Sequence, residues 1–156
     1  MTGDARFEDG REAPLHLGAL DGDDLRVIAA LCQDAVLPGS ELSWRARERR
    51  FAMLINRFRW EDAGGATRPP ERVQSVLSFA NVTGVASQGL RPGAADAVLS
   101  VLSLDWAEDD APAGTVTLHF AGDGAIRLRV EALEVTLRDV TRPYAAPSGR
   151  APRHPE

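Results

Sequence analysis

Arginine and aromatic residues gather in residues 41–61, ELSWRARERRFAMLINRFRWE. Six arginines alternate there with bulky rings, namely Arg45, Arg47, Arg49, Arg50, Arg57 and Arg59 with Trp44, Phe58 and Trp60. Guanidinium groups beside aromatic rings are typical of anion sites and protein interfaces. The alternative is a solvated strand face whose arginines pair with nearby carboxylates. The candidate binding residues are Arg45, Arg57, Arg59 and Trp60, together with Glu131.

Acid–base and nucleophilic chemistry needs a histidine or a paired carboxylate in a suitable place. Of the three histidines, His16 and His154 lie in or near predicted tails, and His119 lies on the polar face of a predicted strand. Glu131 and Glu134 form a second candidate, but arginines on adjacent strands are expected to pair with them. The sequence therefore predicts no catalytic residue.

The sequence also lacks the patterns that are typical of metal and phosphate sites. The carboxylates at Asp105, Glu108, Asp109 and Asp110 do not have the spacing or the central glycine of a calcium loop. A single cysteine, Cys32, excludes an internal disulfide and a cysteine metal cluster, and we expect it in the core. Both glycine-rich stretches, 64–65 and 122–124, lead into predicted strands, whereas phosphate loops lead into helices. No metal and no cofactor is predicted.

Charge and composition restrict the class of partner. All 18 basic residues are arginine, which indicates a GC-rich coding bias, and the net charge is -5. A nucleic-acid binder usually carries a basic face, so no nucleic-acid partner is expected. The N-terminal stretch is polar and acidic, and no apolar run reaches the length of a membrane span. These features predict a cytoplasmic protein without a membrane partner.

The elements that must position these residues begin with residues 115–140, the longest run with a clear period. Val116, Leu118 and Phe120 alternate with polar residues, as do Ile126, Leu128 and Val130, which predicts a hairpin with one buried face. A three-residue loop, 122–124, places the two apolar sets opposite each other. After Val130 the apolar residues move from even-numbered to odd-numbered positions, which predicts a bulge or sharp bend at Glu131 and Ala132.

A helix and a second hairpin precede that run. Asp21 or Asp23 can cap a helix of about four turns whose apolar face runs from Leu25 to Ala35. Residues 41–61 read as two strands joined by a four-residue loop, 47–50, with Trp44 opposite Met53. After Ile55 the apolar residues move from odd-numbered to even-numbered positions, which predicts a second bulge at Asn56–Arg57.

Two further strands, 73–80 and 97–106, complete the predicted sheet. Val73, Leu77 and Phe79 point inward on the first, which is followed by a bend at 81–85 and an exposed loop, 87–96. We predict an α+β fold: mainly antiparallel β, about six strands, bulged, barrel-like or a small sandwich, with one N-terminal helix. The predicted boundaries are a mobile tail, 1–14, one globular domain, 15–140, and a disordered proline-rich tail, 141–156.

Several phrases in this order resemble a known family. They are DLRVIAALCQDAV, RERRFAMLINRFRWE, VLSFANVTGVASQG, DAVLSVLSLDW and GTVTLHFAGDGAIRLRVEALEVTLRDV. Together they are similar to the alphaproteobacterial domain of unknown function 2948 family over residues 15–140. The resemblance implies an alphaproteobacterial lineage and a cytoplasmic setting, and it supplies no catalytic residue.

The function best supported by the sequence is a non-enzymatic module that binds a protein partner or self-associates. The alternative is a small-ligand or anion-binding domain, and an enzyme ranks third. A closed concavity lined by Arg57 and Glu131 favours ligand binding, whereas a flat apolar patch favours a protein partner.

Overall fold

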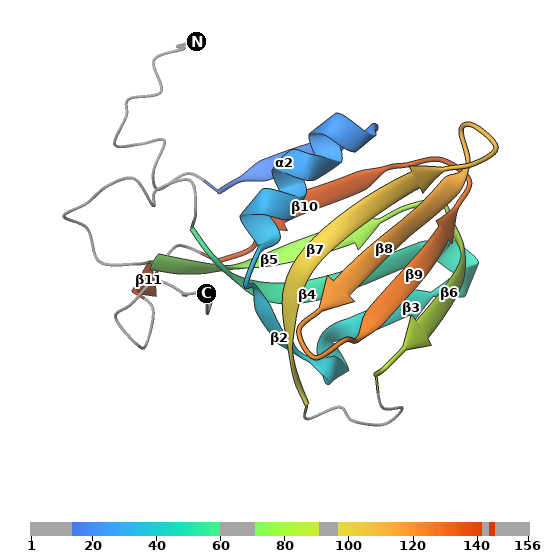
Figure 1. Cartoon of the computed structure of the whole chain (residues 1–156). Coiled ribbons are helices and arrows are strands. Elements are labelled where there is room, and N and C mark those ends of the chain that lie inside the picture. Colours follow the sequence, from blue (N-terminus) through green and yellow to red (C-terminus); the bar gives the residue numbers. More distant parts are fainter. Residues whose placement is uncertain (1–13, 60–70, 91–96, 142–143, 146–156) are drawn as a thin grey trace, which may run out of the picture.

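The computed structural model describes residues 14–59, 71–90, 97–141 and 144–145. These residues form one eleven-stranded sheet and one α-helix (Figure 1). The fold is therefore mainly antiparallel β with one helix, as predicted, but with more strands than the six expected. Three of the additional strands, β1, β2 and β11, have two to four residues, and such short strands leave little periodic signal in a sequence. The fourth, β6, has seven small or polar residues without an apolar alternation, VTGVASQ.

Every strand pairing in the sheet is antiparallel. The strands are β1 (His16–Ala19), β2 (Val36–Pro38), β3 (Leu42–Arg45), β4 (Arg50–Phe58), β5 (Glu71–Phe79), β6 (Val82–Gln88), β7 (Val98–Glu108), β8 (Gly114–Phe120), β9 (Ala125–Val130), β10 (Val135–Asp139) and β11 (Tyr144–Ala145). Their order is β1-β10-β5-β4-β2-β7-β8-β9-β6, with β3 paired to β4 and β11 paired to β5. The path starts at β1 and ends at β6, so the sheet is open.

The sheet folds over into two layers (Figure 1). The first layer contains β1, β10, β5 and β4, and the second contains β7, β8, β9 and β6, with β2 joining β4 to β7. Buried side chains from both layers and from the helix form one apolar core. Phe51 and Phe79, which are paired across β4 and β5, lie there with their rings tilted by 49° and the ring centroids 6.4 Å apart.

The helix α2 (Gly22–Cys32) packs against β7, β1 and β4. Asp21 caps it by accepting a 2.8 Å hydrogen bond from the backbone N–H of Asp24. Leu25, Ile28 and Cys32 face the core, as predicted. The helix is shorter than the four turns expected, because Asp34 adopts a left-handed conformation with φ 66° and the chain then enters β2. Within the described residues, no helix combines the length and apolarity needed to cross a bilayer.

The hairpin β8–β9 has the predicted buried face. Val116, Leu118 and Leu128 are each 0% exposed. The register differs from the prediction by two residues, since Leu118 lies opposite Ile126 and not Leu128. The left-handed turn positions are Gly122 and Asp123, not Gly124. A shift of two residues keeps every side chain on the same face of the sheet, so the predicted buried face is correct although the predicted register is wrong.

The hairpin β3–β4 shows the same kind of shift. Trp44 lies opposite Phe51, and Leu42 lies opposite Met53. The loop has four residues, as predicted, but it runs from Ala46 to Arg49, with Arg49 left-handed at φ 51°. Arg45 and Arg50 are consequently the pair that closes the loop.

Two corners carry the chain between the layers. The link from β5 to β6 contains Asn81, left-handed at φ 59°. The bend predicted at 81–85 and the start of the loop predicted at 87–96 are wrong, because residues 82–88 form the strand β6, which pairs with β9. The link from β9 to β10 spans residues 131–134, which confirms the sharp bend predicted there. The corners are joined by hydrogen bonds from Glu131 N to Asn81 O, 3.0 Å, and from Ala80 N to Glu134 O, 3.0 Å.

The second predicted bulge, at Asn56–Arg57, is wrong. β4 pairs with β5 without interruption from Phe51 opposite Phe79 to Phe58 opposite Arg72. The inward position between Ile55 and Arg59 is occupied by Arg57, which is 0% exposed. The apolar period therefore breaks because a buried cation replaces an apolar residue, while the strand itself stays regular.

The predicted tails fall mostly outside the described residues. Residues 1–13 and 146–156 are not described. Tyr144–Ala145 forms β11, which pairs with Arg72 and Glu71 of β5, and this strand was not predicted from the sequence.

Candidate functional site

The polar cluster with the lowest solvent exposure lies inside the first layer. Arg57 donates from Nη2 to both carboxylate oxygens of Asp139, at 3.0 and 3.3 Å, and from Nε to the Ser75 hydroxyl at 3.0 Å. Ser75 in turn donates to Asp139 at 2.7 Å, and the backbone N–H of Leu15 donates to the same carboxylate at 2.9 Å. The cluster joins β4, β5 and β10 to the chain just before β1.

Two of the predicted binding residues are thus buried. The expectation that Arg57 and Arg59 lie on an exposed hairpin face is wrong, because they are 0% and 4% exposed. A buried guanidinium needs its charge paired and its donors bonded, and Asp139 with Ser75 does this for Arg57. Both arginines therefore lie beneath the surface that could meet a partner. Trp60 lies outside the described residues.

Cys32 lies in the core, as predicted. Burial raises the pKa of its thiol to about 12, and the nearby positive charge of Arg57 lowers it to a smaller extent. Because the thiolate is the reactive form, this cysteine is poorly suited to nucleophilic chemistry.

The arginines at the tip of the β3–β4 hairpin remain exposed. Arg45 lies directly across from Arg50, and it makes a 3.4 Å ion pair with Glu48. Arg49 forms an ion pair with Glu131 at the corner between the layers. Arg50 donates to the Ser78 hydroxyl at 2.9 Å, so its described partner is neutral. The exposed arginines of the run 41–61 therefore lie at this hairpin tip.

A groove of about 230 Å³ opens beside that tip. We call it the hairpin groove, and it is lined by Glu41, Ser43, Arg45, Arg50, Ala52, Met53, Leu54 and Val76. Ala52, Leu54 and Val76 give it an apolar floor on β4 and β5, and the two arginines stand at one end. Of the predicted site residues that the structure describes, only Arg45 belongs to it.

The two predicted residues Arg57 and Glu131 lie in different environments. Arg57 is buried against Asp139, whereas the Glu131 side chain is 55% exposed and paired with Arg49. They therefore do not form the shared concavity that would have favoured ligand binding.

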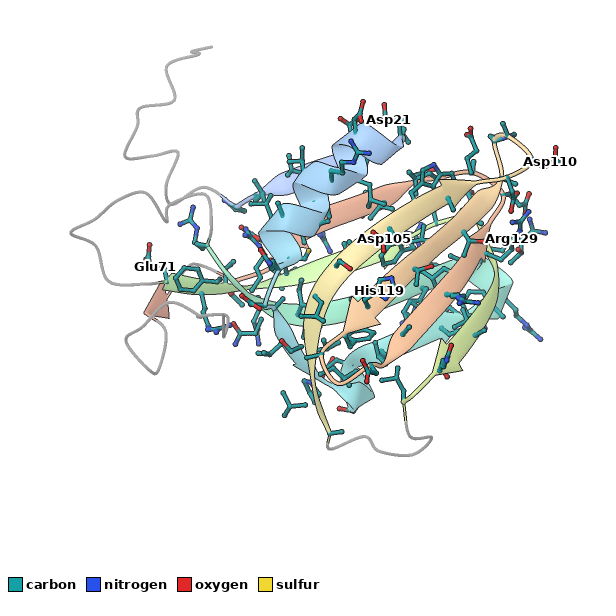
Figure 2. The ribbon with its side chains drawn as sticks, viewed as in Figure 1. Asp21, Glu71, Asp105, Asp110, His119 and Arg129 are labelled. Carbon is teal, nitrogen blue, oxygen red and sulfur yellow. The ribbon has the colours of Figure 1, made fainter. Side chains whose placement is uncertain are left out.

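The strand histidine has one close ionic neighbour. Nε2 of His119 lies 2.9 Å from Oδ2 of Asp105, on adjacent strands of the second layer. Figure 2 shows both labelled side chains on the same face of that layer. They are 43% and 65% exposed, and Ser103 lies across from His119 on β7. An exposed strand face does not exclude water, so this trio lacks the enclosure that covalent catalysis uses.

The acidic turn that contains Asp109 is held by an arginine. Arg129 makes a bidentate contact to the Asp109 carboxylate, and this hydrogen bonding lowers the pKa of Asp109 below its usual range. The labelled residues Arg129 and Asp110 mark this end of the molecule in Figure 2. In the described part of the chain, no three metal-ligating side chains come together.

Sequence reasoning missed three polar residues. Ser75 and Asp139 occupy inward positions of strands whose other inward residues are apolar, and Arg50 was counted only as part of the arginine run. The sequence feature that could have revealed this cluster was the interruption of the apolar alternation at Arg57. A cation on the apolar face of one strand implies a carboxylate on the apolar face of another, and Asp139 continues the inward series of Val135 and Leu137.

Comparison with known proteins gives one match. No curated protein and no solved structure matches the chain. The family model described as protein of unknown function (DUF2948) matches residues 15–154, which include every described strand and the helix. The chain therefore belongs to the DUF2948 family.

Proposed function

We propose that this protein is a non-enzymatic interaction module that binds a partner protein through the hairpin groove. The observation that carries the proposal is the groove itself, which combines an apolar floor with exposed arginines. Apolar surface beside arginine is the composition of protein interfaces, in which a few such residues contribute most of the binding energy.

The size of the groove supports a protein partner over an enclosed small ligand. Small-molecule sites generally enclose about 300–1,000 Å³ and cover most of the ligand. The hairpin groove holds about 230 Å³, which is below this range, so it fits one or two side chains of a larger partner.

Charge indicates which side chains these are. Arg45 and Arg50 lie directly opposite each other, and like charges in that position repel unless an anion lies nearby. Glu48 offsets Arg45, but no described carboxylate pairs with Arg50. A partner segment with an acidic residue beside an apolar one fits both the cations and the floor.

A second candidate is the binding of a small anion at the same arginine pair. It is favoured by the cross-strand position of Arg45 and Arg50 alone and does not use the apolar floor. We also infer a cytoplasmic setting and an alphaproteobacterial origin, for which the support is the family resemblance in the sequence.

The test compares two charge reversals on the same hairpin. Tagged wild-type protein, Arg50→Glu and Arg47→Glu are expressed in the native cell, and the captured proteins are quantified by mass spectrometry. Arg47 is the matched control, because it is exposed on the loop that precedes Arg50, carries the same charge and does not line the groove. We expect a partner that wild type and Arg47→Glu retain and that Arg50→Glu loses by at least about tenfold.

The captured partner is then purified and titrated against the same three proteins by calorimetry, with Leu54→Asp as a fourth. Loss of affinity in both Arg50→Glu and Leu54→Asp supports a partner segment that contacts both the arginine and the apolar floor of the groove. Equal binding by all four proteins contradicts the proposal. Titration with inorganic phosphate tests the second candidate, which predicts saturable binding that Arg50→Glu abolishes and the uncharged Leu54→Asn leaves unchanged.

A further inference from the structure

The strand β6 is an open edge of the sheet. It pairs on one side with β9, and in the described residues no strand pairs with its other side. The backbone N–H of Val82 donates a 2.8 Å hydrogen bond to the carbonyl of Arg49, so the hairpin tip lies against the start of this edge. In Figure 1, β6 borders the molecule at the lower right.

β6 also carries few of the features that prevent edge strands from pairing. Proteins protect open edges with charged residues, proline, bulges or very short strands. The edge strands β1 and β3 have four residues each, and β3 contains Arg45. β6 has seven residues, VTGVASQ, with no charge and no proline, and its register shift lies at its start, between Val82 and Gly84.

The side chains that β6 presents are small. Ala86 and Gly84 lie across from Arg127 and Arg129, on the outer face of the second layer, while Val85 lies across from the buried Leu128. Ala86, Ser87 and Gln88 are exposed. A second strand could thus approach the regular part of β6, Gly84–Gln88, without meeting bulky or charged side chains.

Symmetry restricts how a second copy could pair. In an antiparallel ladder, residues directly opposite each other share a face, so a two-fold pair must place a residue opposite itself. Pairing centred on Ala86 uses all of Gly84–Gln88 and places Val85 opposite Ser87, both on the inward side. Gly84 then faces Gln88, and Ala86 faces Ala86 of the other copy.

We propose that two copies of this chain associate through antiparallel pairing of β6, centred on Ala86, which joins their second layers into one continuous sheet. A neutral strand suits a second copy, because no like charges meet along the ladder. A five-residue ladder alone buries less than the roughly 1,200 Å² of stable interfaces, so the dimer dissociates on dilution. This surface is separate from the hairpin groove, and the inference does not depend on partner binding.

The test is a symmetric cross-link. Residues directly opposite in an antiparallel pair have Cα atoms about 4.5–5.5 Å apart, within the range that a disulfide spans. Mild oxidation of Ala86→Cys is expected to give a covalent dimer. The matched control is Ala107→Cys, which is exposed on the outer face of β7 away from β6, and the native Cys32 is buried in both proteins.

Sedimentation velocity over a hundredfold concentration range provides the second readout. Wild type is expected to shift from monomer towards dimer as concentration rises, and Ala86→Lys, which places like charges opposite each other, is expected to raise the dissociation constant at least about tenfold. Circular dichroism confirms that the lysine variant is folded. A monomer at every concentration, or equal cross-linking of Ala86→Cys and Ala107→Cys, overturns the proposal.

Discussion

Nη2 of Arg57 lies 3.0 Å from Oδ1 of Asp139, and the two side chains are 0% and 2% exposed. This ion pair joins the end of β4 to the end of β10, on either side of β5, whose Ser75 hydroxyl bridges them. The arginine that the sequence offered as a binding residue therefore has a structural role inside the sheet.

Removing one member of this pair should be far more damaging than removing both. Arg57→Met or Asp139→Leu leaves an unpaired buried charge, and we expect each to lower the free energy of unfolding by about 3–5 kcal/mol. The double variant should lose much less than the sum of the two. Urea denaturation of all four proteins measures the coupling, with exposed Arg47→Met as a control within about 0.5 kcal/mol of wild type. Additive losses would show that the pair does not act as a unit.

Core and outer positions of the β8–β9 hairpin should respond differently to truncation. Leu118→Ala and Leu128→Ala each remove a fully buried side chain, and we expect losses of about 2–5 kcal/mol. Thr117→Ala, on the outer face, should cost much less. Chemical denaturation checks this, and comparable losses at all three positions would contradict the face assignment.

The Cys32 thiol should be unreactive in the native protein and should couple folding to alkaline pH. Its pKa rises from 9.0 to about 12 on burial, so the folded state favours the protonated thiol. The stabilisation is complete below pH 9 and is lost as pH rises from about 9 towards 12. We expect stability to fall less over this window in Cys32→Ala than in wild type. Thiol titration with Ellman's reagent should show reaction only after unfolding, and rapid native reaction would contradict this.

Asp109 should titrate nearer its ordinary pKa when Arg129 is removed. The hydrogen bonds from Arg129 lower the pKa of Asp109, so Arg129→Ala should raise it. Since folding lowers this pKa, its stabilising contribution is present at neutral pH and disappears as pH falls through the folded value. Carboxyl NMR titration measures the shift, with Arg127→Ala as the matched control. An unchanged pKa in Arg129→Ala would show that the contact does not form in solution.

The pattern of buried faces was predictable because strand alternation and helix spacing directly reflect which side chains avoid water. This predicted the helix α2, capped by Asp21 or Asp23, the inward face of β5 and the buried sets of β8 and β9, and the structure selects Asp21 as the cap. Exact registers were not predictable. A shift of two residues, as in both hairpins, keeps the same faces and leaves no trace in the pattern.

The sequence by itself determined the fold class, the core and the location of the arginine cluster, since each depends on local pattern and composition. Only the tertiary structure decided which arginines are buried and which are exposed. Arg57 and Arg50 belong to the same strand. Arg57 is buried because it pairs with Asp139, which is 82 residues away in the chain, whereas Arg50 lies at the exposed end of the strand. Burial of a charge depends on a partner brought by the fold, and no local pattern encodes that distance.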